Sequence, residues 1–337
     1  MDLSFLSLAI ASSTTLLALI ILRPIAYKFE LLDKPNLRKK HQGSVPLIGG
    51  LAMFFGAYIG LFYSSIQFIE YKYIFISSLI ILLVGYTDDH FNLKVWPRLG
   101  FQIIVAGILA FVASASIDSF GNIFGNGEIY LNDWALLFTI IAYITGMNAL
   151  NMADGMHGLA GGNSLVTLLS IVLLSLITGN SHGTFLAFIL CAVIPIFLIE
   201  NLCIVRLEKY RVFMGDAGSM FLGLTISYLL ITLSQGNQKL FSPVTALWIF
   251  SVPLFDMFLT ILRRLYKGGS PFQADLGHFH HVLAQYGYSQ RKVLLFIISL
   301  SIIMAIIGII GELRNVHEST MLVLFITFLC FLVFFIK

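Results

Sequence analysis

The apolar residues of this chain fall into runs about as long as a bilayer is thick. A membrane-spanning helix needs about 20 apolar residues, and fewer where good anchors flank it. Eleven segments fit this description: 3–22, 46–68, 73–87, 99–116, 135–150, 159–178, 184–200, 218–233, 244–262, 293–310 and 320–336. Lipid permits only helices or closed barrels, and these runs lack the period-2 alternation of barrel strands. We therefore predict an all-α, polytopic membrane protein with about eleven transmembrane helices.

The composition agrees with a membrane protein. Of the 337 residues, 58% are hydrophobic and 11% are charged, which is more apolar surface than a soluble domain can bury. No soluble domain fits between the runs, so we predict one integral-membrane domain over residues 1–337. The first run, 3–22, has no basic residue before it and no clear cleavage site, which favours a membrane helix over a signal peptide.

Basic residues gather in one alternate set of loops between these segments. That set consists of Arg23, Lys28, Lys34, Arg38, Lys39, Lys40, Lys94, Arg98, Arg206, Lys209, Arg211, Arg263, Arg264, Lys267, Arg291 and Lys292, with Lys337 at the end. The opposite set holds only Lys72, Lys239 and Arg314. Because cytoplasmic loops are enriched in Lys and Arg, we predict an outside N-terminus and a cytoplasmic C-terminus.

Four aspartates lie where apolar runs begin or end on the predicted cytoplasmic face. Asp88 and Asp89 end the third run, Asp154 follows the fifth, and Asp216 precedes the eighth. A carboxylate near hydrocarbon is costly unless it faces water, a metal or a partner. Adjacent carboxylates can share a divalent cation or divide the roles of ligand and base, although a solvated helix end would also explain Asp88 and Asp89. We interpret the four as a composite site for a divalent cation and phosphate.

Asn148, Asn151 and Asp154 recur at every third residue, which keeps them near one face of a helix. Their amide and carboxylate oxygens suit a hard cation or a phosphate-sugar ligand. The glycines that follow permit close backbone approach to a ligand, or simply helix packing. Asp216 lies just before the eighth run, where the N–H groups of a helix N-terminus suit phosphate oxygens; an ordinary N-cap is the alternative.

The loop after the ninth run carries His278, His280 and His281. We expect these histidines to contact an anionic substrate, with a zinc site and a solvated loop as alternatives. Arg263 and Arg264 precede the loop, and they suit either a diphosphate or the role of membrane anchors.

A basic stretch also lies between the first two runs. Lys34, Arg38 and Lys40 would attract a lipid phosphate at the headgroup level, or anionic bilayer lipid in general.

Six stretches, in consistent order from residue 33 to 281, resemble one family. They are DKPNLRKKHQGSVPLIGG, DDHFNL, NALNMADG, KYRVFMGDAGS, SPVTALWI and RRLYKGGSPFQADLGHFHH. They resemble the polyprenyl-phosphate N-acetylhexosamine-1-phosphate transferases of glycosyltransferase family 4. The resemblance implies that undecaprenyl phosphate attacks the β-phosphorus of a UDP-N-acetylhexosamine, with N-acetylglucosamine as the leading sugar, and that UMP leaves. It also implies Mg²⁺ or Mn²⁺ at the diphosphate, and an enzyme of the bacterial inner membrane that starts a cell-surface polysaccharide at the cytoplasmic face.

The resemblance implies roles for matching residues. Asp216 and Asp89 match metal ligands, and Asp88, Asp89 and Asp154 match catalytic positions. The expected substrate contacts are Asn148, Asn151, His157, Arg263, Arg264, His278, His280 and His281. His157 is a departure, since relatives usually carry a second aspartate there (DGxDG against DGMHG). Histidine cannot reproduce the charge of that aspartate, which leaves the sugar, the metal affinity and the pH response open.

Two other readings stay open. A transporter or channel for an anionic substrate would also contain membrane helices with acids, and broken helices or inverted repeats would favour it. The clustering of the acids on one face argues against it. A catalytically impaired homologue is the other reading, motivated by His157. We expect a UDP-sugar, undecaprenyl phosphate and the bilayer as partners and no nucleic acid; homo-oligomerisation is open.

Overall fold

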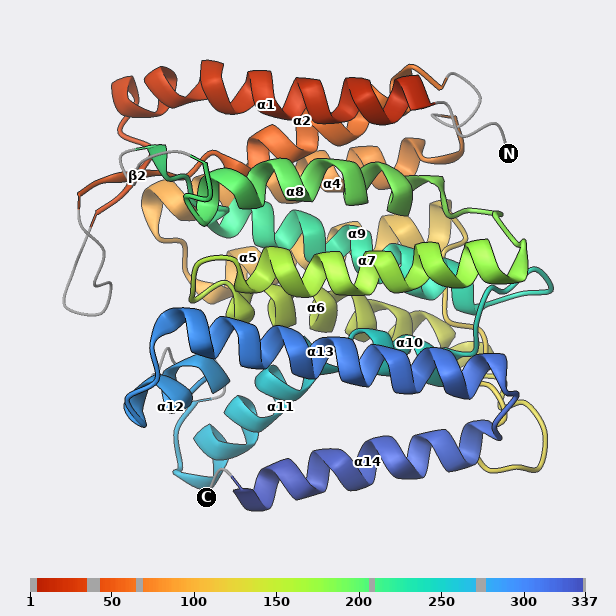
Figure 1. Cartoon of the computed structure of the whole chain (residues 1–337). Coiled ribbons are helices and arrows are strands. Elements are labelled where there is room, and N and C mark those ends of the chain that lie inside the picture. Colours follow the sequence, from red (N-terminus) through yellow and green to blue (C-terminus); the bar gives the residue numbers. More distant parts are fainter. Residues whose placement is uncertain (1–4, 35–42, 65–68, 206–209, 271–276, 336–337) are drawn as a thin grey trace.

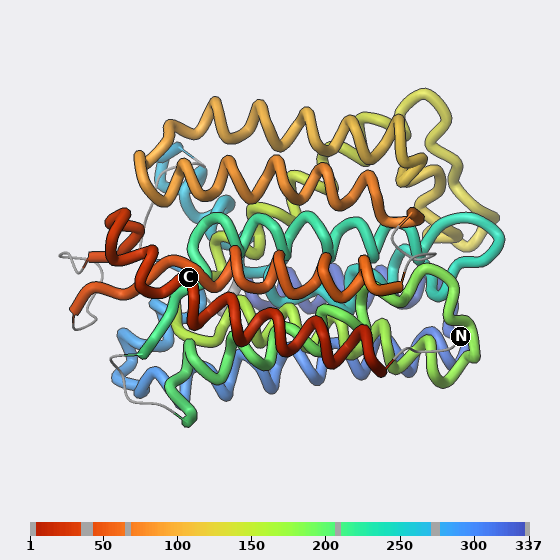
Figure 2. Tube along the Cα trace, turned by 90° about the horizontal axis from the view of Figure 1, so that it is seen from above, coloured from red at the N-terminus to blue at the C-terminus, as the bar shows by residue number. Residues whose placement is uncertain are grey.

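The computed structural model describes residues 5–34, 43–64, 69–205, 210–270 and 277–335, and most of them are helical. The helices lie side by side in one bundle (Figures 1 and 2). The helices are α1 Phe5–Lys28, α2 Gly49–Phe62, α4 Lys72–Phe91, α5 Val95–Gly107 with a π-helix at Ile108–Val112, a 3-10 turn at Asn132–Trp134, α6 Ala135–Ala153, α7 Leu159–Thr178, α8 Phe185–Asn201, α9 Gly215–Ser234, α10 Pro243–Ile249, α11 Ser251–Tyr266, α12 Phe279–Gln285, α13 Gln290–Leu313 and α14 Glu318–Phe335.

The predicted helical class is confirmed, since each of the eleven apolar runs overlaps at least one helix. In the described part of the chain, seven helices are long and apolar enough to cross a membrane, or eight if the bent pair α10–α11 is one span. Helices α2, α8 and α14 are apolar but shorter. The structure therefore supports a multi-pass membrane protein, and the count of eleven spans stays a prediction.

The ninth run is not the single straight helix that the sequence predicts. Helices α10 and α11 meet at an angle of 80°. Pro253 has no N–H group to donate to the carbonyl of Ile249, four residues earlier, which breaks the helical ladder. The hydroxyl of Thr167 donates to that carbonyl over 2.9 Å, so the acceptor exposed by the break is satisfied from α7. The bend turns α11 toward the end of the bundle that carries α12 (Figure 1).

Helix α9 forms the centre of the bundle, because most of its residues are buried by its neighbours. Glycines permit backbone contact with it on two sides. Gly50 of α2 lies against Gly218, and Gly85 of α4 lies against Ala217, so closely that a Cβ atom at either glycine would clash with the α9 backbone. Small residues are the usual means of close helix approach in membranes, where helices gain little from hydrophobic burial.

The fold departs from purely helical structure in a short hairpin. Strands β1 (Leu32–Asp33) and β2 (Val45–Pro46) pair antiparallel, and the amide of Phe213 donates to the carbonyl of Pro46 over 2.9 Å. This pairing ties the first motif of the chain to the residues that lead into α9. Of the basic residues predicted there, Lys34 pairs with Glu30 at 3.1 Å, whereas Arg38 and Lys40 lie outside the described residues.

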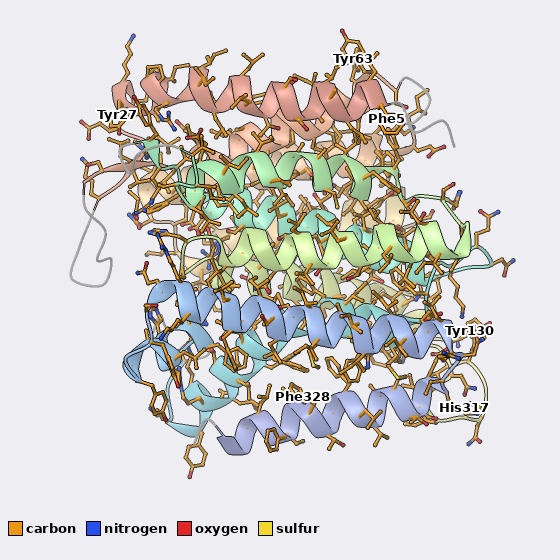
Figure 3. The ribbon with its side chains drawn as sticks, in the orientation of Figure 1. Phe5, Tyr27, Tyr63, Tyr130, His317 and Phe328 are labelled. Carbon is orange, nitrogen blue, oxygen red and sulfur yellow. The ribbon has the colours of Figure 1, made fainter. Side chains whose placement is uncertain are left out.

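The two ends of the bundle are marked by exposed aromatic side chains. Tyr27 lies at one end, and Tyr63 and Tyr130 lie toward the other (Figure 3). Tyrosine favours the level of the lipid headgroups because its ring is apolar and its hydroxyl is polar. The start of α1 and the end of α14 lie at opposite ends of the bundle (Figures 1 and 2).

Candidate active site

The site begins where α4 ends against the start of α9. The first N–H groups of a helix have no partner within the helix, and the helix dipole is positive there. Asp89 supplies the acceptor: its Oδ1 lies 2.9 Å from the amide nitrogen of Asp216, and its Oδ2 lies 3.2 Å from that of Ala217. Gly215 has φ +73° and leaves the space that the Asp89 carboxylate occupies. Asp89 therefore joins two of the predicted motifs directly.

Asp216 faces a third helix. The side-chain amide of Asn151, on α6, donates to Oδ1 of Asp216 over 2.7 Å and to the Ser219 hydroxyl over 3.0 Å. The predicted Asn151 and Asp216 are therefore brought together, although 65 residues separate them in the chain.

Asp88, next to Asp89 in sequence, is held by groups that follow α4 in the chain. Its Oδ1 accepts the Leu93 amide and its Oδ2 accepts the Arg98 guanidinium, both over 2.8 Å. Asp88 also interacts electrostatically with Asp216. The sequence counted Arg98 only among the basic loop residues and missed it as a member of the site. The sequence signal was a cation ten residues after a buried acid, which is too common to be specific.

The three carboxyl groups of Asp88, Asp89 and Asp216 lie close together at this end of α4 and α9. Arg98, among the described residues, contacts Asp88 and acts on Asp216, so with all three groups ionised two negative charges would stay uncompensated by it. Repulsion between Asp89 and Asp216 reflects this excess. Across the described ranges, no group of three or more His, Cys, Asp or Glu side chains is arranged to hold a metal ion.

Asn148 lies one helical turn further from this cluster. Its amide donates to Oε1 of Gln102 over 2.9 Å and to its own helix at Ile144 over 2.8 Å. These contacts fasten α6 to α5 rather than reach Asp216. The structure therefore places Asn148 beside the cluster and not within it.

The loop between α6 and α7 carries Asp154 and His157. Asp154 is half-buried at the end of α6. The His157 ring stacks on Phe213 with centroids 5.0 Å apart, and its Nε2 lies 3.4 Å from Nη1 of Arg211. Arg211 was another basic loop residue to which the sequence gave no site role. Its position five residues before Asp216 in the RVFMGDAGS stretch was the available signal.

The histidine segment packs against the same loop. His280 is buried, and a Cβ atom at Gly155, next to Asp154, would clash with its Nε2. The His280 and His281 rings lie 4.1 Å apart, and those of His278 and His280 lie 5.8 Å apart. The structure thus brings the predicted histidines to the predicted Asp154 segment.

The two arginines of α11 differ in environment. Arg263 donates from Nη1 to the carbonyl of Gly277 over 2.8 Å, which holds the start of the histidine segment. Arg264 is buried in the bundle. Arg263 is therefore engaged in shaping the loop, and a diphosphate contact for either arginine stays a prediction.

Burial makes His280 sensitive to acid. Desolvation, and then the neighbouring His281, lower the pKa of His280 from 6.5 to about 3. The folded protein thus holds the ring neutral while an unfolded chain would protonate it, so stability should fall as the pH drops from 6.5 toward 3. In detergent, the wild-type melting temperature should fall on acidification, and His280→Phe should reduce this dependence. An equal pH dependence in both proteins would contradict the prediction.

Apolar helices joined to a cluster of acids and amides at one end of the bundle define a multi-pass membrane protein with a polar site. Comparisons with known proteins place it in a family. Residues 71–234 match the model of glycosyl transferase family 4. The chain is 39% identical over 320 residues to the undecaprenyl-phosphate alpha-N-acetylglucosaminyl 1-phosphate transferase of Haemophilus influenzae. This match covers 94% of the present chain and 90% of the relative.

Two further relatives carry the same name. The protein from Yersinia pestis is 36% identical over 305 residues, and this match covers 90% of the present chain and 83% of the Yersinia protein. The protein from Escherichia coli K12 is 36% identical over 312 residues, and this match covers 92% of the present chain and 84% of the Escherichia protein. The chain belongs to glycosyl transferase family 4, as the resemblance in its sequence predicts. The break between α10 and α11 is a feature that a transporter would share, but these relatives are transferases.

Proposed function

We propose that the protein transfers N-acetylglucosamine 1-phosphate from UDP-N-acetylglucosamine to undecaprenyl phosphate and releases UMP. The observation that carries this proposal is the similarity to transferases of that name along at least 83% of their length. The contacts among Asp89, Asn151 and Asp216 add support, since they unite three of the stretches on which the resemblance rests. The product would begin a cell-surface polysaccharide.

The residues present fit a hard divalent cation such as Mg²⁺ or Mn²⁺. Carboxylate and amide oxygens are the donors such ions prefer, and the excess negative charge of the aspartate cluster suits a doubly charged ion. Asp216 and Asp89 would hold it, with Asn151 orienting Asp216. The bound ion would neutralise charge on the diphosphate, which is the main requirement of phosphoryl transfer.

The protein's own groups would then position the reactants. An oxygen of the lipid phosphate attacks the β-phosphorus of the sugar nucleotide, and the bond from that phosphorus to UMP breaks. Asp88, paired with Arg98, and Asp154, beside the histidine segment, are the carboxylates left for proton transfer or substrate contact. Arg263, Arg264 and the three histidines would meet the nucleotide sugar. Lys34, Arg38 and Lys40 would meet the lipid phosphate.

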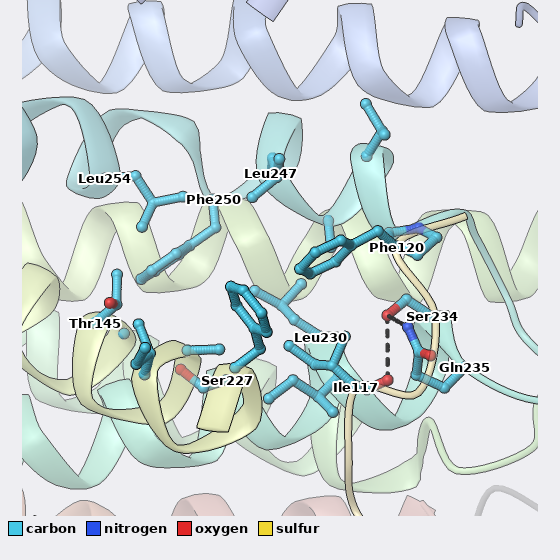
Figure 4. A pocket seen from close by; sticks show the side chains of 18 of the residues that line it. Ile117, Phe120, Thr145, Ser227, Leu230, Ser234, Gln235, Leu247, Phe250 and Leu254 are labelled. Carbon is cyan, nitrogen blue, oxygen red and sulfur yellow. Dashed lines mark hydrogen bonds between the residues drawn. The ribbon is translucent and has the colours of Figure 1, made fainter. Parts of the chain in front are cut away.

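An apolar cavity offers a place for part of the lipid chain. It has a volume of about 420 Å³ and lies between α6, α9 and the α10–α11 pair (Figure 4). Phe120, Leu230, Leu247 and Phe250 are among the side chains that line it. Gly146, also in its wall, precedes Asn151 by five residues, a rise of about 7.5 Å along α6. A polyprenyl tail in this cavity would therefore have its phosphate end toward the aspartates.

We place the protein in the bacterial inner membrane, with eleven crossings, the N-terminus outside and the site on the cytoplasmic face. The distribution of Lys and Arg supports this orientation, and the position of the start of α1 and the end of α14 at opposite ends of the bundle suits an odd number of crossings. UDP-sugars are cytoplasmic, so the donor would reach the site directly.

An exchange assay tests the function. Purified protein with tritiated UDP-N-acetylglucosamine, undecaprenyl phosphate and Mg²⁺ should form a radioactive lipid and release UMP. A panel of other UDP-N-acetylhexosamines should give lower rates, and a higher rate with one of them would correct the sugar. Formation of no lipid-linked sugar from any donor would overturn the enzyme reading and favour the transporter or the impaired homologue.

His157 gives a sharper test of the departure from the family pattern. His157→Asp would place a shorter, negatively charged side chain facing the Arg211 guanidinium, which now lies 3.4 Å from Nε2 of His157, so an ion pair can replace the present contact. We expect kcat to stay within about tenfold of wild type and the Mg²⁺ requirement to shift. Turnover against Mg²⁺ concentration measures both. His182→Asp, at an exposed loop position, controls for the change of charge; complete loss in His157→Asp alone would show a role of its own for His157.

A further inference from the structure

Asp256 is a buried acid to which the sequence gave no role. It lies on α11, after the bend, and only 5% of it is exposed. A buried carboxylate is costly unless hydrogen bonds and opposite charge compensate for its lost hydration. Both of its oxygens are used: Oδ2 lies 2.9 Å from Nδ1 of His278, and Oδ1 accepts the Phe279 amide over 2.7 Å.

These two contacts fix different properties of the histidine segment. The bond from the Phe279 amide holds the backbone at the start of α12. The bond to His278 sets the imidazole tautomer, because a carboxylate oxygen only accepts, so Nδ1 must carry the hydrogen. The nitrogen turned away from Asp256 is then Nε2. The Thr260 hydroxyl, 3.4 Å from Nδ1, flanks the same pair.

The position of α12 decides where His280 lies. His280 follows Phe279 directly and is packed against Gly155, next to Asp154. Neither ring nitrogen of His280 has a hydrogen-bond partner among the described residues, so hydrogen bonds to those residues do not hold this ring in place. The Asp256 carboxylate anchors the first residue of α12 by a hydrogen bond, and the bond from Arg263 to Gly277 lies just before it.

We propose that Asp256 is a positioning residue, which orients His278 toward the sugar nucleotide and holds the histidine segment against the Asp154 loop. This inference rests on the proposed transfer reaction for its kinetic consequence. Asp256 acts through His278 and does not touch the substrate itself. Supporting residues of this kind change rates without supplying a reacting group.

Asp256→Asn is the informative variant, because asparagine keeps the size and can still accept the Phe279 amide. Its side-chain NH₂ would face Nδ1 of His278 and favour the opposite tautomer. We expect kcat to fall about 10- to 100-fold, with KM for the UDP-sugar within about threefold of wild type. In the His278→Gln background the same change should have little further effect, because its partner is already gone.

Glu312→Gln is a matched control. Glu312 accepts the Ser242 amide over 2.9 Å at the start of α10, so it also anchors a short helix by a carboxylate, but in the α10–α13 contact and not in the site. This variant should lower thermal stability and leave kcat unchanged. Wild-type kcat in Asp256→Asn, or an undiminished effect of that change in the His278→Gln background, would overturn the proposal.

Nitrogen-15 NMR of wild-type protein with labelled histidine provides a readout that needs neither enzyme activity nor an Asp256 variant. His278, identified by its loss in His278→Gln, should carry its hydrogen on Nδ1 at neutral pH. An Nδ1 atom that carries no hydrogen would overturn the role of Asp256, regardless of the kinetic results for the variants. If the wild type fails in the exchange assay while Nδ1 is protonated, the transfer reaction is refuted and the Asp256–His278 pair stands.

Discussion

Replacing Asp216 by asparagine should lower turnover by about 10²- to 10³-fold or more while the protein still folds. Asp216 has a side-chain oxygen fixed by Asn151 and is flanked by the Asp88 carboxylate. An amide of the same shape removes the charge that would hold the cation and disturbs little of the packing. UMP release at increasing Mg²⁺ measures the loss, and the melting temperature monitors folding.

The control for this variant is Asp118→Asn. Asp118 is exposed in the segment between α5 and α6, where its carboxylate accepts the Ser116 hydroxyl. The same chemical change there should leave turnover unaltered. Near-normal rates of the Asp216 variant at saturating Mg²⁺ would remove Asp216 from the ligand set and leave Asp89 as the principal candidate.

The helices were predictable because their signal is local. Lipid forces each apolar run to satisfy its own backbone, so run length alone indicates a helix. The 80° bend was not predicted, because its causes are separated in the chain: Pro253 removes a donor, and Thr167 of another helix satisfies the acceptor that this exposes. The hairpin of residues 32–33 and 45–46 was missed for a similar reason, as part of its support comes from Phe213.

The site divides in the same way. Asp89, Asn151 and Asp216 could be grouped from sequence because each lies at the same end of an apolar run, and the structure joins them by hydrogen bonds. Partners that depend on side-chain direction could not be found. Arg98 and Asp256 were uninformative in sequence, since a cation near a helix end and an acid within an amphipathic helix are both common. Contacts between distant segments gave them a role.

Gly85 connects the packing of the bundle to the site. It lies one turn before Asp89 on α4, and a Cβ atom there would clash with the backbone of Ala217 on α9. Gly85→Ala should push α4 away from α9 and lengthen the bonds from Asp89 to the α9 amides. We expect a loss of about 1–3 kcal/mol in the free energy of unfolding, as for overpacked cores, together with a large loss of turnover.

For the same substitution at another glycine, Gly100→Ala, we expect the opposite change in stability and no loss of turnover. Gly100 lies in α5, where an added Cβ atom would meet nothing within 4 Å. Alanine favours a helix over glycine by about 0.5–1 kcal/mol, so this variant should be slightly more stable and fully active. Denaturation in detergent and the exchange assay compare the two. If both variants changed stability and turnover alike, helix propensity would explain the results. Opposite changes in the free energy of unfolding, with turnover lost only in Gly85→Ala, would show that close contact between α4 and α9 maintains the aspartate cluster.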